Sequence, residues 1–136
     1  MARILALDYG TVRTGIAVTD ELQLIASGLT TVETKELIPF LDNYLKKESV
    51  ERIVVGLPKQ MDNTASESEE SIQEFLKKLE AKFPSMPLER QDERFTSKMA
   101  FQSMLDSGMK KKKRRDKALV DEISATLILQ AYLNRI

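Results

Sequence analysis

The stretch that decides the fold is ILALDYG, residues 4–10, which leads through a turn into the alternating stretch IAVT, residues 16–19. An unbroken apolar run such as residues 4–7 is typical of a strand buried on both faces of a sheet. Asp8 ends this run. The carboxyl ends of such strands are where open α/β sheets place their ligand crevices. Packing requires no acid at this position, so Asp8 is the first candidate for a functional residue.

The hydrophobic pattern predicts the order of the remaining elements. A third strand is expected over residues 22–32, followed by a helix that Thr34 caps and by a buried strand over residues 52–58. A helix then opens at a capping box, residues 66–69, and a short strand follows over residues 87–91. Two more helices complete the chain. The prediction is an α/β fold: a mixed five-stranded sheet, with a three-strand meander followed by alternating helix and strand, flanked by helices.

Length and composition limit the chemistry. The chain has 136 residues, of which 42% are hydrophobic, so we expect a single domain over residues 1–136 with a real core. Cysteine is absent, which excludes disulfides, thiolate catalysis and cysteine-based zinc sites. Histidine is also absent, which removes the usual general base and the Ser-His-Asp arrangement. Any chemistry must use carboxylates, Lys, Arg, Ser, Thr or Tyr.

Charge and hydropathy give no sign of a membrane protein. The 21 basic and 21 acidic residues balance, so local patterning must indicate any polyanionic partner. No stretch approaches the roughly 18 to 20 apolar residues that span a bilayer, and the N-terminus lacks the pattern of a signal peptide. We therefore expect a cytoplasmic protein with no membrane partner.

Three acids are expected to converge. The first, fourth and fifth strands should run the same way, which places Asp8 and Glu93 at one edge of the sheet. On the helical wheel of the last helix, Asp121 projects near the middle of the apolar face that Ala125 and Leu129 help to form. A carboxylate on a core-facing stripe is costly unless it is paired or binds a metal. Asp8, Glu93 and Asp121 are thus the predicted inward-pointing set.

An oxygen-only site of this kind prefers Mg²⁺ or Mn²⁺ to zinc. Two ions about 3.5 to 4 Å apart can orient a water and stabilise the leaving oxygen of a phosphodiester displacement. The sequence therefore predicts a metal-dependent nuclease with two ions and no histidine base.

Each acid also has a simpler interpretation. Asp8 can be a turn residue that satisfies its own backbone, and Glu93 can pair with Arg94 or a lysine. Asp121 can cap the last helix, or pair with Arg13 or Arg94. The agreement of all three acids on one edge favours the metal site.

A basic run precedes the last helix and is the longest block of like charge in the chain. Such a run can neutralise the phosphates of a nucleic acid, or it can be a solvated loop. It consists of Lys110, Lys111, Lys112, Lys113, Arg114 and Arg115.

Four motifs carry a resemblance to a known family: LDYG at residues 7–10, VGLP at residues 55–58, DERFTS at residues 92–97 and VDEISA at residues 120–125. With them, nearly the entire chain resembles the YqgF (RuvX) family of pre-16S rRNA nucleases. These proteins are also described as Holliday-junction-resolvase-like members of the RNase H-like superfamily.

The resemblance implies an RNase H-like domain in which Asp8, Glu93 and Asp121 are the catalytic and metal-binding acids. It implies cleavage of the 5′ extension of precursor ribosomal RNA, in ribosome biogenesis. Arg13 and Arg94 match basic positions of the family's motifs and are expected to contact substrate phosphate or to hold the acids in place. The basic run would add further phosphate contacts.

Other functions remain open at this stage. One alternative is resolution of Holliday junctions in branched DNA, and a second is a non-catalytic nucleic-acid-binding module. A third is the phosphate-binding turn of sugar kinases and actin-like ATPases, which the Asp-x-Gly-Thr of residues 8–11 also resembles. The chain is expected to be a monomer or a homodimer, since paired cleavage of a junction would favour a symmetric dimer.

Overall fold

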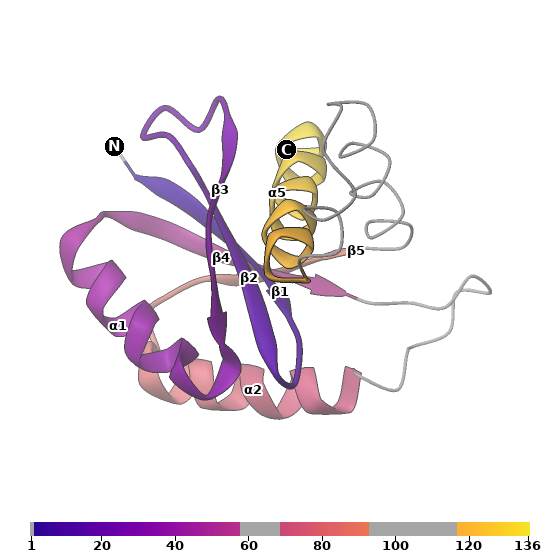
Figure 1. The fold of residues 1–136 in the computed structure, drawn as a ribbon. Coiled ribbons are helices and arrows are strands. Elements are labelled where there is room, and N and C mark those ends of the chain that lie inside the picture. The colour runs from indigo at the N-terminus through magenta and orange to yellow at the C-terminus, as the bar shows by residue number, and fades with distance from the viewer. Residues whose placement is uncertain (1, 58–68, 93–116) are drawn as a thin grey trace.

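The computed structural model describes residues 2–57, 69–92 and 117–136, which form a five-stranded mixed sheet with helices on both faces (Figure 1). The strand order is β3-β2-β1-β4-β5. In chain order the elements are β1 (Arg3–Tyr9), β2 (Arg13–Thr19), β3 (Ala26–Glu33), the 3-10 turn η1 (Thr34–Glu36), α1 (Leu37–Lys47), β4 (Val50–Leu57), α2 (Glu69–Lys82), β5 (Leu88–Asp92) and α5 (Lys117–Arg135).

The directions of the strands agree with the predicted topology. β1 pairs antiparallel with β2, and β2 pairs antiparallel with β3, which makes the meander. β4 lies parallel to β1 on its other side, and β5 lies parallel to β4. The carboxyl ends of β1, β4 and β5 therefore meet at one edge of the sheet, as expected for a crossover half.

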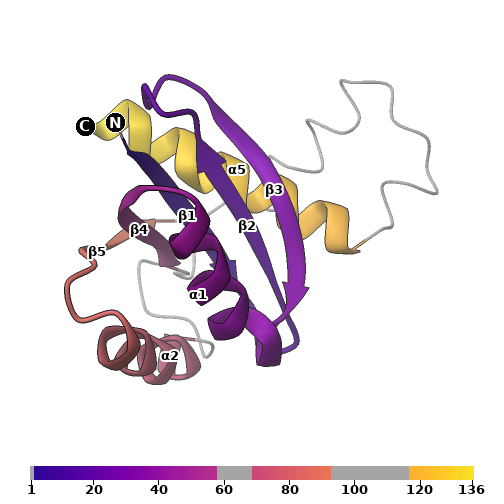
Figure 2. The ribbon, with the colours of Figure 1, turned by 90° about the vertical axis from the view of Figure 1, so that its left-hand side faces the viewer.

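Alternate side chains of β1 pack into two hydrophobic cores, one on each face of the sheet. Leu5 and Leu7 pack with α1 and α2 on one face of the sheet, while Ile4 and Ala6 pack with α5 on the other. All of these side chains are fully buried. Figure 2, turned by a quarter, shows α1 in front of the strands and α5 behind them, and Figure 1 shows α1 and α2 on the side of the sheet opposite α5. The apolar run of residues 4–7 thus forms a strand covered on both faces, as predicted.

The third strand starts later than predicted. The expected strand began at residue 22, but β3 begins at Ala26. The Asp20 carboxylate accepts hydrogen bonds from the backbone N–H groups of Leu22, Leu24 and Ile25, at 3.2, 2.8 and 2.8 Å. These bonds hold the preceding residues in a turn, because a short Asp side chain competes with the sheet for backbone donors.

Thr34 does not cap a helix, contrary to the sequence prediction. Its hydroxyl donates to the carbonyl oxygen of Gly10, and its backbone N–H donates to the carbonyl of Val12 at 2.9 Å. The buried Thr14 hydroxyl lies 2.9 Å from that of Thr34. The side chain that should have capped α1 instead holds the turn between β1 and β2, directly after Asp8.

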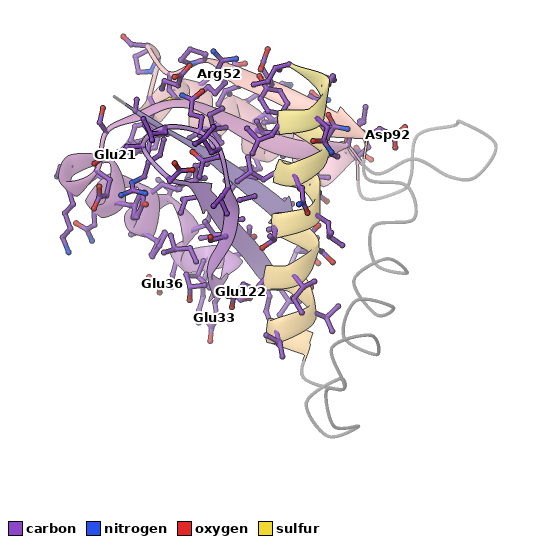
Figure 3. The ribbon with its side chains drawn as sticks, turned by 90° about the horizontal axis from the view of Figure 1, so that it is seen from above. Glu21, Glu33, Glu36, Arg52, Asp92 and Glu122 are labelled. Carbon is purple, nitrogen blue, oxygen red and sulfur yellow. The ribbon has the colours of Figure 1, made fainter. Side chains whose placement is uncertain are left out.

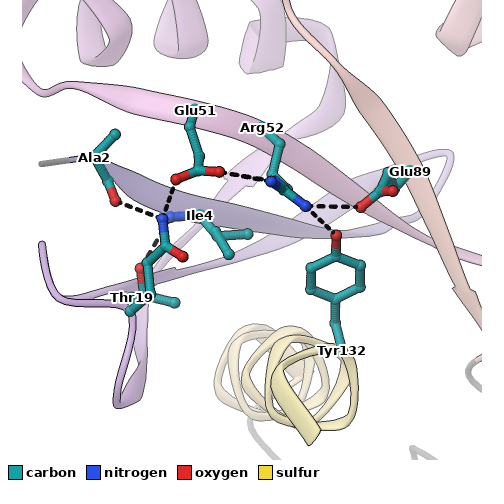
Figure 4. Close-up of polar contacts among 8 residues, drawn as sticks. Ala2, Ile4, Thr19, Glu51, Arg52, Glu89 and Tyr132 are labelled. Atoms are coloured by element: carbon teal, nitrogen blue, oxygen red, sulfur yellow. Dashed lines mark hydrogen bonds and ion pairs between the residues drawn. The ribbon is translucent and has the colours of Figure 1, made fainter. Parts of the chain in front are cut away.

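A polar network near the start of β4 anchors the C-terminal part of α5. Arg52 of β4 donates to the hydroxyl of Tyr132 at 2.8 Å and forms ion pairs with Glu51 and Glu89, at 2.7 and 3.5 Å (Figure 4). Tyr132 is fully buried, so its hydroxyl needs this partner. The network fixes where α5 lies along the sheet.

Candidate active site

Asp8 lies at the end of β1 and points toward α5. It follows Ile4 and Ala6 at the spacing of two that keeps side chains on one face of a strand, and both of those residues pack against α5. Its cross-strand partner on β2 is Gly15, which has no side chain. The space beside the Asp8 carboxylate is therefore available to the helix.

α5 fills that space with the backbone around Asp121. A Cβ atom added to Gly15 would lie 2.0 Å from the carbonyl oxygen of Asp121 and 2.9 Å from the backbone nitrogen of Glu122. Only glycine permits so close an approach of helix and strand. The predicted apolar face of this helix is confirmed, because Ala125, Ile128, Leu129 and Tyr132 are all buried.

A second glycine leaves room for the side chain of the next residue of α5, Glu122. A Cβ at Gly28 of β3 would lie 2.6 Å from Oε1 of Glu122. Figure 3 shows Glu122 at the end of α5 that lies toward β3. The acid at position 122 thus packs over the meander.

The structure brings Asp8 and Asp121 together electrostatically. Burial and, as the smaller cause, the negative charge of Asp121 together raise the pKa of Asp8 to about 7. A carboxyl group removed from water and facing a second carboxylate holds its proton more tightly. Asp8, near the start of the chain, and Asp121, near its end, therefore lie close to each other, as predicted.

Arg13 supplies a positive charge beside Asp121. Its Nε lies 3.1 Å from Oδ2 of Asp121, and the two side chains are 37% and 27% exposed. The simpler interpretation of Asp121, a pair with Arg13, is thus realised beside the acid pair. The contact uses one carboxylate oxygen, and a pair this exposed is worth about 0 to 1 kcal/mol. Arg13 can therefore exchange partners at low cost.

The third predicted acid lies outside the described residues. β5 ends at Asp92, which pairs with Leu57 of β4, and Figure 3 shows Asp92 at that end of the strand. Glu93 and Arg94 come directly afterwards and are not described, and the basic run of residues 110–115 is likewise outside the described ranges. Within residues 2–57, 69–92 and 117–136, no group of three metal-ligating side chains is present.

The donor set of Asp8 and Asp121 fits a hard divalent cation. Both supply carboxylate oxygens, which Mg²⁺ and Mn²⁺ prefer, and their mutual repulsion would be relieved by a positive ion between them. The raised pKa of Asp8 is a measure of that repulsion together with burial. These two side chains could hold the metal, with further ligands from water or substrate.

Arg90 is a residue of this region that the sequence did not reveal. From β5 it donates to the carbonyl oxygens of Val55 and Gly56, at 3.1 and 2.9 Å, and it forms a two-pronged ion pair with Glu69 at 2.8 and 3.0 Å. Arg90 lowers the pKa of Glu69 through these hydrogen bonds. It ties the end of β4, beside Asp8, to the start of α2, and no local pattern could have indicated contacts so distant in sequence.

Sequence comparisons agree with the resemblance. The profile of the RuvX family, described as Holliday junction resolvase, matches residues 2–135. A protein of Christiangramia forsetii, named "Putative pre-16S rRNA nuclease", is 74% identical over 133 residues, which is 98% of each chain. A Bacteroides fragilis protein with the same name is 60% identical, over 98% of this chain and 96% of its own.

Solved structures share the fold at low sequence identity. RuvC of T. thermophilus, solved in complex with a Holliday junction substrate, matches with a TM-score of 0.57 and 16% identity, over 99% of this chain and 96% of that one. The fowlpox virus Holliday junction resolvase matches with a TM-score of 0.54 and 12% identity, over 98% of both chains. The predicted RNase H-like fold class is therefore confirmed.

Proposed function

The chain belongs to the RuvX family and is a nuclease, and from this premise we propose that it is a divalent-metal-dependent endonuclease that trims the 5′ end of pre-16S rRNA. Two relatives named for that activity are 74% and 60% identical over nearly their full length. Family membership also favours nuclease chemistry over the phosphate-binding turn of kinases.

One observation carries the assignment of the site: Asp8 and Asp121, which are 113 positions apart in sequence, face each other where Gly15 lets α5 touch the sheet. Fold stability alone gives no reason to place two carboxylates where each raises the electrostatic cost of ionising the other. We assign Asp8, Asp121 and Glu93 as the metal ligands and catalytic acids, with Mg²⁺ or Mn²⁺ as cofactor, as two ions.

The metal, when bound, would polarise the scissile phosphate and activate a water. The residues of the chain then have separate tasks. Asp8 and Asp121 would hold the metal through their carboxylate oxygens, and their position would set where the reacting phosphate lies. Arg13 neutralises Asp121 before substrate arrives and can contact a phosphate afterwards.

The remaining substrate contacts are assigned to Arg94 and to the basic run. Phosphate contacts of this type position a nucleic acid without reading its sequence. These residues are Lys110, Lys111, Lys112, Lys113, Arg114 and Arg115, together with Arg94. The protein would act in the cytoplasm, as a monomer or a homodimer. No helix within the described residues is long and apolar enough to span a bilayer.

A second candidate function is resolution of Holliday junctions. The description of the family and the junction-bound RuvC structure favour it, although the latter shares only 16% identity. The same metal site would serve either substrate, since RNA and branched DNA are distinguished by shape and groove contacts.

The test compares the two substrates directly. Purified protein is incubated with 5′-extended 16S precursor RNA and with a four-way DNA junction, in Mn²⁺, Mg²⁺ or EDTA. We expect metal-dependent cleavage with a higher kcat/KM on the precursor. Faster cleavage of the junction would favour the resolvase, and binding of both substrates without cleavage of either would overturn the nuclease assignment of the site.

A further inference from the structure

A cavity lies on the face of the sheet opposite the acid pair. It opens between η1, α1 and α2, below the carboxyl end of β1, and has a volume of about 380 Å³. Cavities that hold small organic ligands begin at about 300 Å³. The space is therefore adequate for one nucleotide.

The floor of this cavity is aromatic and rigid. Tyr9 stacks on Phe75 with ring centroids 4.6 Å apart and planes at 25°, and Ile38 lies beside them. Phe75 is only 5% exposed, so the core holds the stack in place. Such a surface suits the flat face or edge of a nucleobase.

The rim of the cavity carries charged side chains. Lys35 and Lys78 supply two ammonium groups, and Glu74 supplies one carboxylate. Lys35 pairs with Glu33 at 3.3 Å, but their side chains are 76% and 63% exposed. Exposed pairs are weak, so this lysine can turn to a phosphate at little cost.

Hydrogen-bonding groups complete the lining. Thr11 and Ser71, which carry hydroxyls, line the cavity, and Glu74 is close enough to Tyr9 for its charge to contribute, after burial, to a raised pKa of that phenol. Donors and acceptors beside an aromatic floor match the sugar and base edge of a nucleotide. A simple anion would leave the apolar floor unused.

The position of the cavity connects it to the acids. Tyr9 follows Asp8 directly, and successive residues of a strand point to opposite faces. A strand of nucleic acid that passes over the end of β1 can thus place one phosphate at Asp8 and a neighbouring nucleotide below the sheet edge. We propose that this cavity binds one nucleotide of the substrate strand, with its base against Tyr9, which Phe75 supports from the core, and its phosphate between Lys35 and Lys78. The proposal rests on the proposed nuclease function, because the bound nucleotide is part of the nuclease's substrate strand.

The test measures binding without cleavage. A fluorescent single-stranded RNA that carries the 5′ extension is titrated in EDTA with wild type and with the double variant Lys35→Glu/Lys78→Glu. The matched control is Lys77→Glu/Lys82→Glu, which changes the net charge equally at exposed positions of α2 outside the cavity. We expect the cavity variant to lose about 10-fold more affinity than the control, and its log-log salt slope to fall by about 0.7 for each lost phosphate contact. Equal losses in both variants would overturn the proposal.

Crosslinking tests the same placement in the wild-type protein, so the answer does not depend on how a variant folds. RNA with a single photoreactive uridine near the cleavage point is irradiated in the complex, and the crosslinked residue is mapped by mass spectrometry. Crosslinks to Tyr9 or Phe75 support the proposal, and crosslinks that avoid the cavity contradict it. Free uridine monophosphate is the second arm. If the mononucleotide binds at Tyr9 but the RNA strand never does, the cavity belongs to a free nucleotide instead.

The outcomes separate this proposal from the nuclease assignment. If precursor is cut but the cavity variant binds like its control, only the nucleotide site fails. If nothing is cut but crosslinks map to the cavity, the nuclease assignment fails and the binding site stands.

Discussion

Gly15 of β2 touches the backbone of Asp121, so closely that a Cβ atom would lie 2.0 Å from the Asp121 carbonyl oxygen. This contact sets the distance between the last helix and the strand that carries Asp8. Backbone lies on both sides of the contact, so no rotation of a side chain can relieve a larger residue.

Gly15→Ala should therefore displace α5 and destabilise the protein. Forcing a methyl group into a packed interior costs about 1 to 3 kcal/mol, and we expect a loss in this range in urea unfolding. Gly28→Ala is the control, because its Cβ would meet the flexible end of Glu122, which can move. Equal costs for the two variants would contradict the special role of Gly15.

The raised pKa of Asp8 predicts a pH-dependent stability in EDTA. The folded-state pKa of about 7 exceeds the ordinary value near 3.8, so the contribution of Asp8 is complete below about pH 4 and is lost as the pH rises through 7. Relative to Asp8→Asn, the wild type should lose up to about 4 kcal/mol of unfolding free energy between pH 4 and 8. Urea unfolding of both proteins across this range checks the prediction, and parallel profiles would refute it.

Arg13 should compete with a metal for Asp121. Removing the guanidinium in Arg13→Gln takes away the ion pair with Asp121, so Mn²⁺ should bind about 5-fold tighter, which corresponds to the roughly 1 kcal/mol upper range of an exposed pair. Isothermal titration measures this affinity. Arg13→Lys keeps the charge and serves as control. Unchanged or weaker Mn²⁺ binding in the Gln variant would mean that Arg13 does not oppose the metal.

Substitutions of Arg90 and of Glu69 should have non-additive effects on the free energy of unfolding. Both side chains are mostly buried, at 21% and 15% exposure, so removing one partner leaves a charge without compensation. We expect Arg90→Met to cost about 3 kcal/mol, and Arg90→Met/Glu69→Leu to recover part of this loss. A double-mutant cycle by urea unfolding measures the coupling, and strictly additive losses would argue against it.

Local regularities made much of this fold predictable. The apolar run before Asp8 indicated a strand covered on both faces, and the spacing of Ala125 and Leu129 placed Asp121 on the helix face that packs on the sheet. Both signals depend on residues that are neighbours in sequence or one helical turn apart.

The rest depends on contacts between distant segments. The turn before β3 formed because Asp20 captures backbone donors, although the apolar composition of residues 22–25 resembles a strand. Gly15 has a role only because α5 returns to β2 from the other end of the chain. The cavity below Tyr9 likewise arises from the packing of α2 against β1.

The central claim, that Asp8 and Asp121 form the catalytic site, is tested most directly by single-turnover cleavage of precursor RNA in Mn²⁺. Asp8→Asn and Asp121→Asn are compared with wild type and with Asp42→Asn, which alters a half-buried acid on α1 paired with Lys46. We predict a loss of at least ~100-fold for both site variants, the scale of removing one electrostatic group from an active site, with RNA binding within about 3-fold of wild type and an unchanged control. Cleavage by Asp8→Asn at the wild-type rate would contradict the account.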